Sequence, residues 1–545
     1  MKILIGGAWP FANGSLHIGH LAGLLPGDVI ARYYRAKGDD VYFVSGSDCY
    51  GTPISVRAKQ ENRLPQEISD FYHAEFCECF NKLGFSYDRY GKTSSDEHKA
   101  FVREFHKAMY EGKYIYEDEA PQAFCERCGI ALADRFVSGE CPSCSEPARG
   151  DQCEACGDIL EPENLINPLC SVCGGTPVFR PAKHLFIAVS KLEKKLSDFI
   201  GARPHWRKNA AAFSRRYINE GLRDRAITRA IDCGIDVPKD GYGDKKIYVW
   251  AENVLGYLSM SKTVSVQRGE RYEDLWGDNS RHYYVHGKDN IPFHTIILPS
   301  LMLANGGNWK LPDDIISSEY LTLEGRKIST SLNWAIWVKD IAGKYHPDSI
   351  RYFILANGPE KRDADFTWRE FVHSHNGELL GAWGNFVNRT LAFVYKYFGA
   401  AVPDGKINPE IGANTTALYT TAGSLIENGN LKAALDTLFG FIRLGNKYFD
   451  AGRPWETRNG ADGADMESCS ETVYNCVQII ANLSVMLEPF LPFSSAKIRG
   501  WLEIENSWSV KSVPAGFLIP EPEILFERLD KKVVDEELEK LEELQ

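Results

Sequence analysis

The sequence predicts an α/β protein that continues into an α-helical bundle. Residues 2–8 form an apolar run typical of a short buried strand. A helical apolar pattern follows, and Gly38 stands just past its end. Helical spacing recurs at 376–398, 413–428, 431–450 and 470–489, which is typical of a helical bundle. The 545 residues exceed the ~250–300 of a single core, so we expect two to four domains.

The composition limits the classes of function that the chain can have. Hydrophobic residues make up 44% and charged residues 25% of the sequence, and the net charge is −12. That charge argues against a uniformly basic surface for nucleic acid. The basic stretches at 203–208 and 215–229 are either a local nucleic-acid patch or a solvated face. With no apolar run of about 18 residues and no signal-peptide pattern, we expect a cytoplasmic protein without a membrane span.

Eight of the 14 cysteines form four C-x-x-C pairs, Cys125/Cys128, Cys141/Cys144, Cys153/Cys156 and Cys170/Cys173. Each pair resembles a knuckle that aims two thiolates at one point, and two knuckles supply the tetrahedral set of structural zinc. We therefore predict two structural Zn²⁺ ions that hold an insertion together and take no part in the chemistry. A disulfide framework and redox pairs are the alternatives; a reducing compartment disfavours the first, and the clustering disfavours the second.

The pairing of the knuckles has two solutions. Sequential pairing joins each knuckle to its neighbour along the chain. Nested pairing places Cys141, Cys144, Cys153 and Cys156 on the first ion and Cys125, Cys128, Cys170 and Cys173 on the second. Only eight residues separate the two inner knuckles, a hairpin-like link that favours nesting.

The segment His17-Ile18-Gly19-His20 follows the first strand and a turn-rich stretch, and it opens the first helix. Two imidazoles then lie one turn apart, where free N–H groups and the helix dipole favour an anion. Such donors can hold a phosphate or the charge that develops on one. The alternative is a strand–helix corner with two structural histidines.

Further polar groups follow buried strands. Asp48 comes after a strand at 41–44, and 286–290 follow another at 283–285. Since ligands of open α/β sheets bind at the carboxyl ends of strands, Asp48 is placed to meet an ammonium group. The segment 321–331 combines a glycine turn, two cations and several hydroxyls, which suits a loop that closes over phosphates. The run 247–250 predicts an aromatic-rich strand, and Tyr257 follows it at the start of a helix. Core packing is the alternative for Trp250 and Tyr257.

Taken together, these segments resemble the two signatures of class I aminoacyl-tRNA synthetases, His17-Ile18-Gly19-His20 and Lys327-Ile328-Ser329-Thr330-Ser331. Within that class the chain is similar to the methionyl-tRNA synthetases. The similarity runs in the family's order from residue 3 to about residue 530, and that collinearity is more specific than any one motif. The further matching segments are 10–14, Asp48 with 51–53, 134–137, 224–229, 249–250 with 256–257, 286–289 with 293–294, and 454–455.

The resemblance implies that ATP, with Mg²⁺, activates methionine and that tRNA(Met) then receives the methionyl group. It implies catalytic roles for His17, His20, Lys327 and Ser329. It implies a methionine pocket made of Ala8, Trp9, Phe11, Asp48, Arg229, Trp250, Asn253, Val254, Tyr257, Asn290 and His294. It implies ATP contacts from His17, Gly19, His20, Gly287, Asp289, Lys327 and Thr330. It implies that Asn388 and Trp455 meet the anticodon, where an aromatic side chain can stack on a base; Trp455 as bundle core is the alternative.

For the fold, the resemblance implies a Rossmann-type doubly wound parallel sheet with a zinc-knuckle insertion and a C-terminal α-helical bundle. The expected parts are 1–115, the first half of the catalytic domain; 116–230, the insertion, with knuckles at about 120–180; 231–325, the second half; 326–375, the signature loop and stem-contact region; 376–530, the anticodon-binding bundle; and 531–545, an acidic helical tail. The chain has no further tRNA-binding domain of the kind through which some relatives dimerise, so we expect a monomer.

Some positions depart from the family's pattern. Thr330 replaces the second lysine of the signature, and the neighbouring Arg326 is a candidate to restore that charge. Pro26 falls inside the first helix, where it removes a backbone donor. Ala392 stands where some relatives carry an arginine, and Trp9 is bulkier than the usual residue. Two rival functions follow: a catalytically inactive zinc-ribbon protein that binds nucleic acid, and an enzyme that activates another carboxylate.

Overall fold

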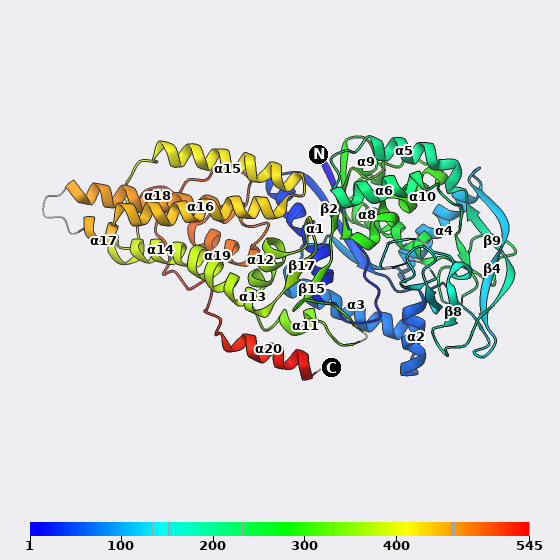
Figure 1. Ribbon diagram of the computed structural model, residues 1–545. Coiled ribbons are helices and arrows are strands. Elements are labelled where there is room, and N and C mark those ends of the chain that lie inside the picture. The colour runs from blue at the N-terminus through cyan, green and yellow to red at the C-terminus, as the bar shows by residue number, and fades with distance from the viewer. Residues whose placement is uncertain are drawn as a thin grey trace. The chain divides into compact units, whose positions relative to one another are not determined.

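The computed structural model describes residues 1–132, 134–150, 153, 155–158, 160–231, 233–330, 332–458 and 464–543. It divides the chain into two compact units. The first consists of Met1–Ser15, Tyr42–Cys77 and Tyr87–Ser317, and the second of Leu16–Val41, Glu78–Ser86 and Ser318–Gln545. The α/β fold with a C-terminal helical region is confirmed (Figure 1).

The first unit is built on a five-stranded sheet in the order β14-β13-β1-β2-β3. Strands β1 and β13 pair in parallel, as do β2 and β3. The chain leaves β1 toward β2 and β3 and later returns to the other side of β1, so the strand order reverses between β1 and β13. Ligands of such sheets bind beyond the carboxyl ends of strands at this reversal. The strands are β1 (Lys2–Gly7), β2 (Asp40–Ser47), β3 (Arg89–Lys92), β13 (Ser280–Gly287) and β14 (Asp314–Ser318).

Helices and short helical turns accompany this sheet in the first unit, and most of them contribute buried side chains to one apolar core. They are α2 (Thr52–Glu61), α3 (Pro65–Lys82), α4 (Asp96–Tyr110), η3 (Val189–Leu192), α5 (Glu193–Gly201), α6 (Lys208–Asn219), α7 (Val249–Glu252), η4 (Asn253–Leu255), α8 (Gly256–Arg268), α9 (Tyr272–Leu275), η5 (Lys288–Asn290), η6 (Phe293–Ile297) and α10 (Leu298–Asn305).

An insertion made of antiparallel strands carries the cysteines. Its long ribbon pairs residues 115–124 of β4 with residues 178–187 of β9 (Figure 1). The four knuckles lie between the end of β4 and the start of β9 in the chain. A separate small core packs around the cysteines. The elements are β4 (Ile115–Cys125), β5 (Ile130–Ala131), η1 (Asp134–Phe136), β6 (Val137–Glu140), β7 (Pro147–Arg149), η2 (Pro162–Asn164), β8 (Ile166–Cys170), β9 (Val178–Ile187), β10 (Arg225–Ala226) and β11 (Thr228–Arg229). Strand β12 (Lys246–Ile247) follows the insertion and pairs with β11.

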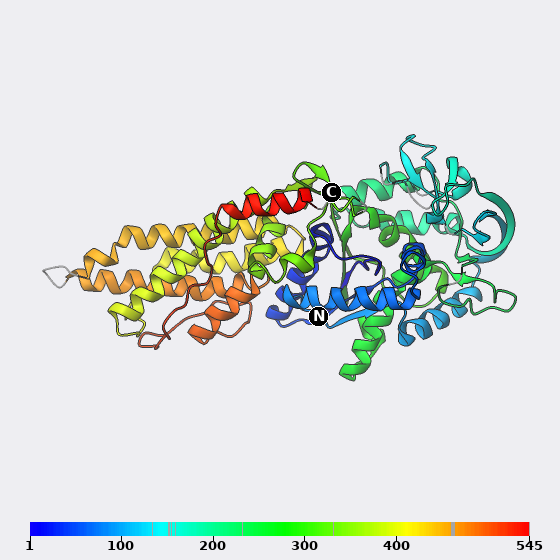
Figure 2. The same ribbon diagram turned by 90° about the horizontal axis from the view of Figure 1, so that it is seen from below.

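The second unit is mostly helical. Its long helices α15, α16 and α18, yellow to orange, run side by side in both views (Figures 1 and 2). The elements are α1 (Ile18–Lys37), β15 (Leu321–Leu323), β16 (Arg326–Lys327), α11 (Val338–Ile341), α12 (Pro347–Asn357), β17 (Ala364–Phe366), α13 (Trp368–Ser374), η7 (His375–Gly384), α14 (Asn385–Tyr397), α15 (Pro409–Glu427), α16 (Leu431–Gly452), α17 (Pro454–Thr457), α18 (Ala464–Met486), α19 (Pro492–Leu502) and α20 (Lys532–Glu543).

Helix α1 continues through Pro26 and ends where the sequence predicts. Gly38 caps it in the left-handed region, with φ of 87°. Pro26 has no N–H to give to the carbonyl of Ala22, which lies four residues earlier. The Ser318 hydroxyl donates to that carbonyl instead, at 2.9 Å. A side chain from a distant segment therefore compensates for the proline.

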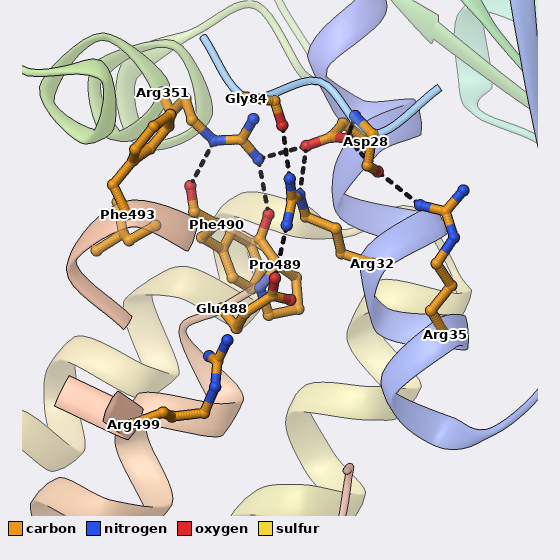
Figure 3. A network of polar contacts seen from close by, with 12 residues as sticks. Asp28, Arg32, Arg35, Gly84, Arg351, Glu488, Pro489, Phe490, Phe493 and Arg499 are labelled. Carbon is orange, nitrogen blue, oxygen red and sulfur yellow. Dashed lines mark hydrogen bonds and ion pairs between the residues drawn. The ribbon is translucent and has the colours of Figure 1, made fainter. Parts of the chain in front are cut away.

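A buried charge network anchors the middle of α1 (Figure 3). Asp28 accepts hydrogen bonds from Arg32 at 2.9 Å and forms an ion pair with Arg351 of α12 at 2.7 Å. Arg32 also reaches Glu488, just after α18, at 2.6 Å. Burial acts to raise the pKa of Asp28, but the two guanidinium groups and Ser86 lower it to about 2. The carboxylate is therefore ionised and firmly held.

Candidate active site and metal centres

The two signature histidines form a reciprocal cap at the start of α1. The backbone N–H of Gly19 donates to Nδ1 of His17 at 3.1 Å, and the backbone N–H of His17 donates to Nδ1 of His20 at 3.1 Å. This is the geometry of a capping box, with imidazoles in place of the usual hydroxyl and carboxylate. The sequence predicted the pair on one helical turn; the structure adds that both rings also satisfy the backbone.

This cap fixes the protonation of both rings. Because each Nδ1 accepts a hydrogen bond, the neutral ring carries its proton on Nε2. Burial lowers the pKa of His17 well below its usual value, and His20 adds to the effect. Burial likewise lowers the pKa of His20 to about 4. The rings lie 3.9 Å apart, so the start of α1 presents two neighbouring N–H donors in addition to its backbone amides.

Lys327 lies on a tight hairpin. Strands β15 and β16 pair Leu323 with Arg326, and the two residues between them, Glu324 and Gly325, both have positive φ. That is a two-residue turn that matches the twist of the strands. Lys327 is exposed, so its ammonium group can meet a phosphate that arrives from solvent.

The rest of the signature loop is closed by Ser329 and Trp334, whose backbones exchange two hydrogen bonds of 2.9 Å. Thr330 is exposed, and Ser331 lies outside the described residues. The Arg326 guanidinium lies over the Trp334 ring at 4.2 Å, whereas the Lys327 ammonium group lies 5.9 Å from the centroid of the Tyr320 ring. Since neighbouring strand residues face opposite sides, Arg326 is held away from Lys327. Its predicted role as a replacement charge stays a prediction.

In the first unit, Asp48 lies just past β2 and is fully buried. The amide of Asn253 donates to one carboxylate oxygen at 2.7 Å, and the backbone N–H of Tyr50 donates to the other at 3.0 Å. A backbone bridge ties the segment of Asp48 to that of Phe11. The structure thus brings three of the predicted pocket residues together at the carboxyl ends of strands.

Trp9 fills the space beyond β1. A Cβ atom added to Gly46 or to Gly256 would lie 2.2 or 2.3 Å from its ring, so both glycines are required by the close approach. Trp9 is 7% exposed, and its Nε1 has no hydrogen-bond partner among the described residues. Its ring lies edge-on to Tyr257, with centroids 6.4 Å apart.

Tyr257 belongs to a second buried group. His294 contacts the carbonyl of Asn290 through Nδ1 at 2.8 Å, so its Nε2 accepts from the Tyr257 hydroxyl, also at 2.8 Å. His286 stacks on His294 with centroids 4.2 Å apart. Burial lowers the pKa of His294 to about 4. His294 is therefore neutral. With Tyr257 and His286 it forms an aromatic wall that suits an apolar or thioether side chain.

The remaining predicted residues of this unit lie nearby along the chain. Ala8 follows β1 and donates to the carbonyl of Val285 at 2.9 Å, which ties β1 to β13. Gly287 ends β13, and a Cβ atom there would meet no neighbour. The others stand on short helical segments: Trp250 on α7, Val254 on η4, and Asp289 and Asn290 on η5.

Arg229 has a different environment from Asp48. Its guanidinium forms a two-pronged pair with Asp134, at 3.0 and 2.8 Å, and donates to the carbonyls of Ala226 and Thr228. It also lies over the ring of Tyr248 at 4.3 Å. The structure therefore shows that Arg229 ties β11 to η1 within the insertion. The predicted contact with methionine stays a prediction.

Sequence reasoning missed His98 and Glu252. Nε2 of His98 lies 2.9 Å from a carboxyl oxygen of Glu252, and Nδ1 lies 2.8 Å from the Ser259 hydroxyl. Burial lowers the pKa of His98 to about 3 and, with help from Asp48, raises the pKa of Glu252 well above its usual range. The pair is neutral, so Glu252 adds no second negative charge beside Asp48. Both residues stand on ordinary helical segments, where no local pattern marks them.

The eight knuckle cysteines gather into two four-sulfur clusters, and the nested grouping is confirmed. One contains Cys125, Cys128, Cys170 and Cys173, and the other Cys141, Cys144, Cys153 and Cys156. Sulfur atoms that face each other across the clusters lie 3.5, 3.6 and 3.8 Å apart. Tetrahedral ligands at ~2.3 Å from zinc would lie about 3.8 Å apart. The donor set and its spacing therefore fit one tetrahedral ion per cluster.

The four knuckles share one backbone turn. The residue after each second cysteine has positive φ and donates to the carbonyl of the first cysteine at 2.8 Å. Three of these residues are Gly129, Gly157 and Gly174, for which the left-handed region carries no penalty. The fourth is Ser145, with φ of 62°. The turn thus aims both thiolates of each knuckle at one point.

In the helical unit, Asn388 is exposed on α14 and Trp455 is exposed on α17. Trp455 is 41% exposed, which excludes the alternative that it belongs to the bundle core. Its ring lies 6.1 Å from that of Phe449, and the guanidinium of Arg389 is 5.9 Å away. An exposed indole beside a cation is a suitable stacking surface for an unpaired base.

Among the described residues, none of the helices combines the length and the apolar character that a membrane span requires.

Comparisons with known proteins bear on both units. A family model described as tRNA synthetases class I (M) matches residues 3–391, and one described as the anticodon binding domain of methionyl tRNA ligase matches residues 402–544. Methionyl-tRNA synthetase of Mycobacterium tuberculosis, solved with methionyl-adenylate, has the same fold. Its TM-score is 0.82 at 21% identity, and the match covers 97% of this chain and 100% of that one.

Sequence relatives are similar over the whole chain. Methionine–tRNA ligase 1 of Alkaliphilus oremlandii (strain OhILAs) is 53% identical over 544 residues, which are 99% of this chain and 100% of the relative. Methionine–tRNA ligase of Bacillus mycoides (strain KBAB4) is 50% identical over 545 residues, 99% of each. This chain therefore belongs to the methionyl-tRNA synthetase family of class I tRNA synthetases.

Proposed function

We propose that this chain joins methionine to tRNA(Met) in two steps at the expense of ATP. The main support for this proposal is that relatives named methionine–tRNA ligase share 53% and 50% sequence identity with this chain over almost its whole length. In the first step a carboxylate oxygen of methionine attacks the α-phosphorus of ATP; the bond to the bridging oxygen breaks, and pyrophosphate leaves. In the second, a ribose hydroxyl of the tRNA 3′ end attacks the methionyl carbonyl, and AMP leaves.

Charge complementarity supports the roles of the signature residues. The Nε2–H groups of His17 and His20 would donate to the α-phosphate as negative charge builds on it. Lys327 and Ser329 would meet the leaving pyrophosphate, with Mg²⁺ neutralising further phosphate charge when it is bound. Because methionine's own carboxylate is the nucleophile, the protein contributes mainly positioning and electrostatics. The other ATP contacts that we propose are Gly19, Gly287, Asp289 and Thr330.

For methionine, we propose that the Asp48 carboxylate pairs with the α-ammonium group. The Asn253 amide, which donates to Asp48, would hold the Asp48 carboxylate in place. Trp9, Tyr257 and His294 would surround the apolar side chain, because they already form a buried aromatic group beyond β1 and β13. The other proposed pocket residues are Ala8, Phe11, Arg229, Trp250, Val254 and Asn290. Because Glu252 is neutral, Asp48 would be the counter-charge of the ammonium group in this pocket.

Methionine-dependent exchange of labelled pyrophosphate into ATP tests this function, and Asp48→Asn sharpens the test. The variant keeps the shape of the side chain but removes its charge. We expect the KM for methionine to rise about 100-fold, or about 2.7 kcal/mol, since a buried charge loses its partner. The KM for ATP should stay within about twofold. No exchange by the wild-type chain, with tRNA binding intact, would favour the inactive nucleic-acid-binding alternative; exchange with another amino acid would favour the other rival.

We further propose that the two clusters bind zinc. All four positions of each ion would be taken by cysteine, so the ions stabilise the fold of the insertion and leave no site for substrate. Two ions per chain are expected by elemental analysis. Changing both Cys141 and Cys153 to Ser should remove one ion and leave the other, because both belong to the same cluster. Loss of both ions would contradict the independence of the two clusters.

The same family membership supports three further proposals. Asn388 and Trp455 would contact the anticodon of tRNA(Met), the chain would act as a monomer, and it would work in the cytoplasm, where its three substrates occur together. We keep the six-part domain division of the sequence, in which the bundle at 376–530 binds the anticodon.

A further inference from the structure

Tyr397 is an exposed aromatic residue that the proposed chemistry does not use. It ends α14, and the residue is 36% exposed. The guanidinium of Arg458 lies 3.8 Å from the ring centroid. In the described part of the chain no carboxylate pairs with Arg458, and its Nε is buried without a hydrogen-bond partner. An exposed ring is thus held against a cation that has no carboxylate partner among the described residues.

A continuous ladder of rings joins Tyr397 to Trp455. The ring of Trp455 lies 6.1 Å from Phe449, Phe449 lies 6.1 Å from Phe393, and Phe393 lies 4.6 Å from Tyr397. Arg389 is stacked on the same ladder, 4.2 Å from Phe449. The two ends, Trp455 and Tyr397, are exposed, whereas Phe393 and Phe449 are buried. The buried rings therefore fix the positions of two exposed ones.

We propose that Tyr397 and Arg458 form a second stacking site, for an unpaired base of the tRNA anticodon loop. This inference rests on the proposed contact between Trp455 and the anticodon. Proteins that bind single strands combine aromatic rings, on which bases stack, with cations along the backbone. Arg458 serves both needs, because its flat guanidinium can stack with a base and its charge can meet a phosphate.

A second exposed tyrosine on α14 provides a matched control. Tyr395 is 40% exposed, but it has no cation over its ring among the described residues. It stands seven residues, or about two turns, after Asn388 and therefore on the same face of the helix. Tyr397 stands on the opposite face, toward Arg458. The two tyrosines thus lie on two different faces of α14, and our proposal places the additional stacked base on the face of the ladder.

The test measures the Kd of the full-length protein for a tRNA(Met) transcript, with methionine-dependent pyrophosphate exchange as the control for folding. Tyr397→Ala should raise the Kd about tenfold, the loss of one base stack. Tyr397→Phe and Tyr395→Ala should leave it unchanged. Arg458→Ala should also weaken binding and lower the slope of log Kd against log salt concentration by about 0.7, the value for one phosphate of a single strand. All four variants should retain exchange.

Several results would overturn the proposal. Unchanged tRNA binding by Tyr397→Ala, or a loss confined to Tyr395→Ala, would mean that the loop does not follow the ladder. A change in self-association with unchanged tRNA binding would make the patch a contact between copies. Trp455→Ala separates this failure from that of the proposed function: if it weakens binding and Tyr397→Ala does not, only the second site fails. If neither does, the anticodon site itself lies elsewhere.

Discussion

Replacing Arg351 by Met should cost the protein about 3–5 kcal/mol of stability, since it breaks a buried ion pair by removing one partner. The guanidinium of Arg351 is 1% exposed. It donates to the carbonyls of Leu83, Pro489 and Phe490 in addition to its pair with Asp28. Methionine fills a similar volume but leaves three buried carbonyls without a hydrogen-bond donor. It also removes one of the two guanidinium groups that pair with the Asp28 carboxylate (Figure 3).

The measurement is the rate of irreversible thermal inactivation together with the urea midpoint of the helical signal, because a chain of two units need not unfold in one step. Arg443→Met is the matched control. Its ion pair with Glu378 at 3.0 Å is half exposed, and such pairs contribute about 0–1 kcal/mol. Equal effects of the two variants would contradict the prediction.

A double-mutant cycle with Asp28→Asn isolates the pair. A buried neutral amide costs less than a buried carboxylate that has lost a cation. Adding Asp28→Asn should therefore recover part of the stability that Arg351→Met removes. The network should also make the stability of the protein depend on pH in acid. Because the pKa of Asp28 is lowered to about 2, its contribution is present above the unfolded value near 3.9 and is lost as the pH falls toward 2.

Local patterns predicted much of the fold. The helix from residue 18 to 37 followed from apolar spacing and the glycine at its end, and both are local signals. The nested cysteine clusters followed from the short link between the inner knuckles, because few residues leave few ways to close a tetrahedral site. The ends of the four long helical segments of the bundle were predicted to within six residues, as expected for long periodic segments.

The tertiary partners could not be predicted. Asp28 and Arg32 are four residues apart on α1, a spacing that is typical of exposed pairs on any helix. Only the approach of Arg351, more than 300 residues later, makes the pair buried. The same holds for Arg229 and Asp134, and for His98 and Glu252. No local signal separates these residues from ordinary ones, because each owes its state to a segment far away in the chain.

Removing the imidazoles of His17 and His20 should lower the rate of adenylate formation about 10²–10³-fold each, the usual cost of a donor to a developing negative charge. Plain alanine variants would also remove the helix cap. His17→Asn and His20→Gln avoid this, because Asn is a good N-cap residue and Gln can return the hydrogen bond of a capping box. These variants should lose the rate and keep the stability of α1.

The pH dependence tests the protonation state. Burial holds the pKa of His20 at about 4, so the ring is neutral at neutral pH and Nδ1 stays available to the cap. The rate of pyrophosphate exchange should therefore be flat from about pH 5.5 to 8, without an inflection near the usual histidine pKa of about 6.5. Below about 6.5 the unfolded chain binds protons that the folded chain does not, so stability falls as the pH approaches 4. An inflection near 6.5 that disappears in His20→Gln would show a ring that titrates freely, and it would refute the cap as the device that fixes the two donors.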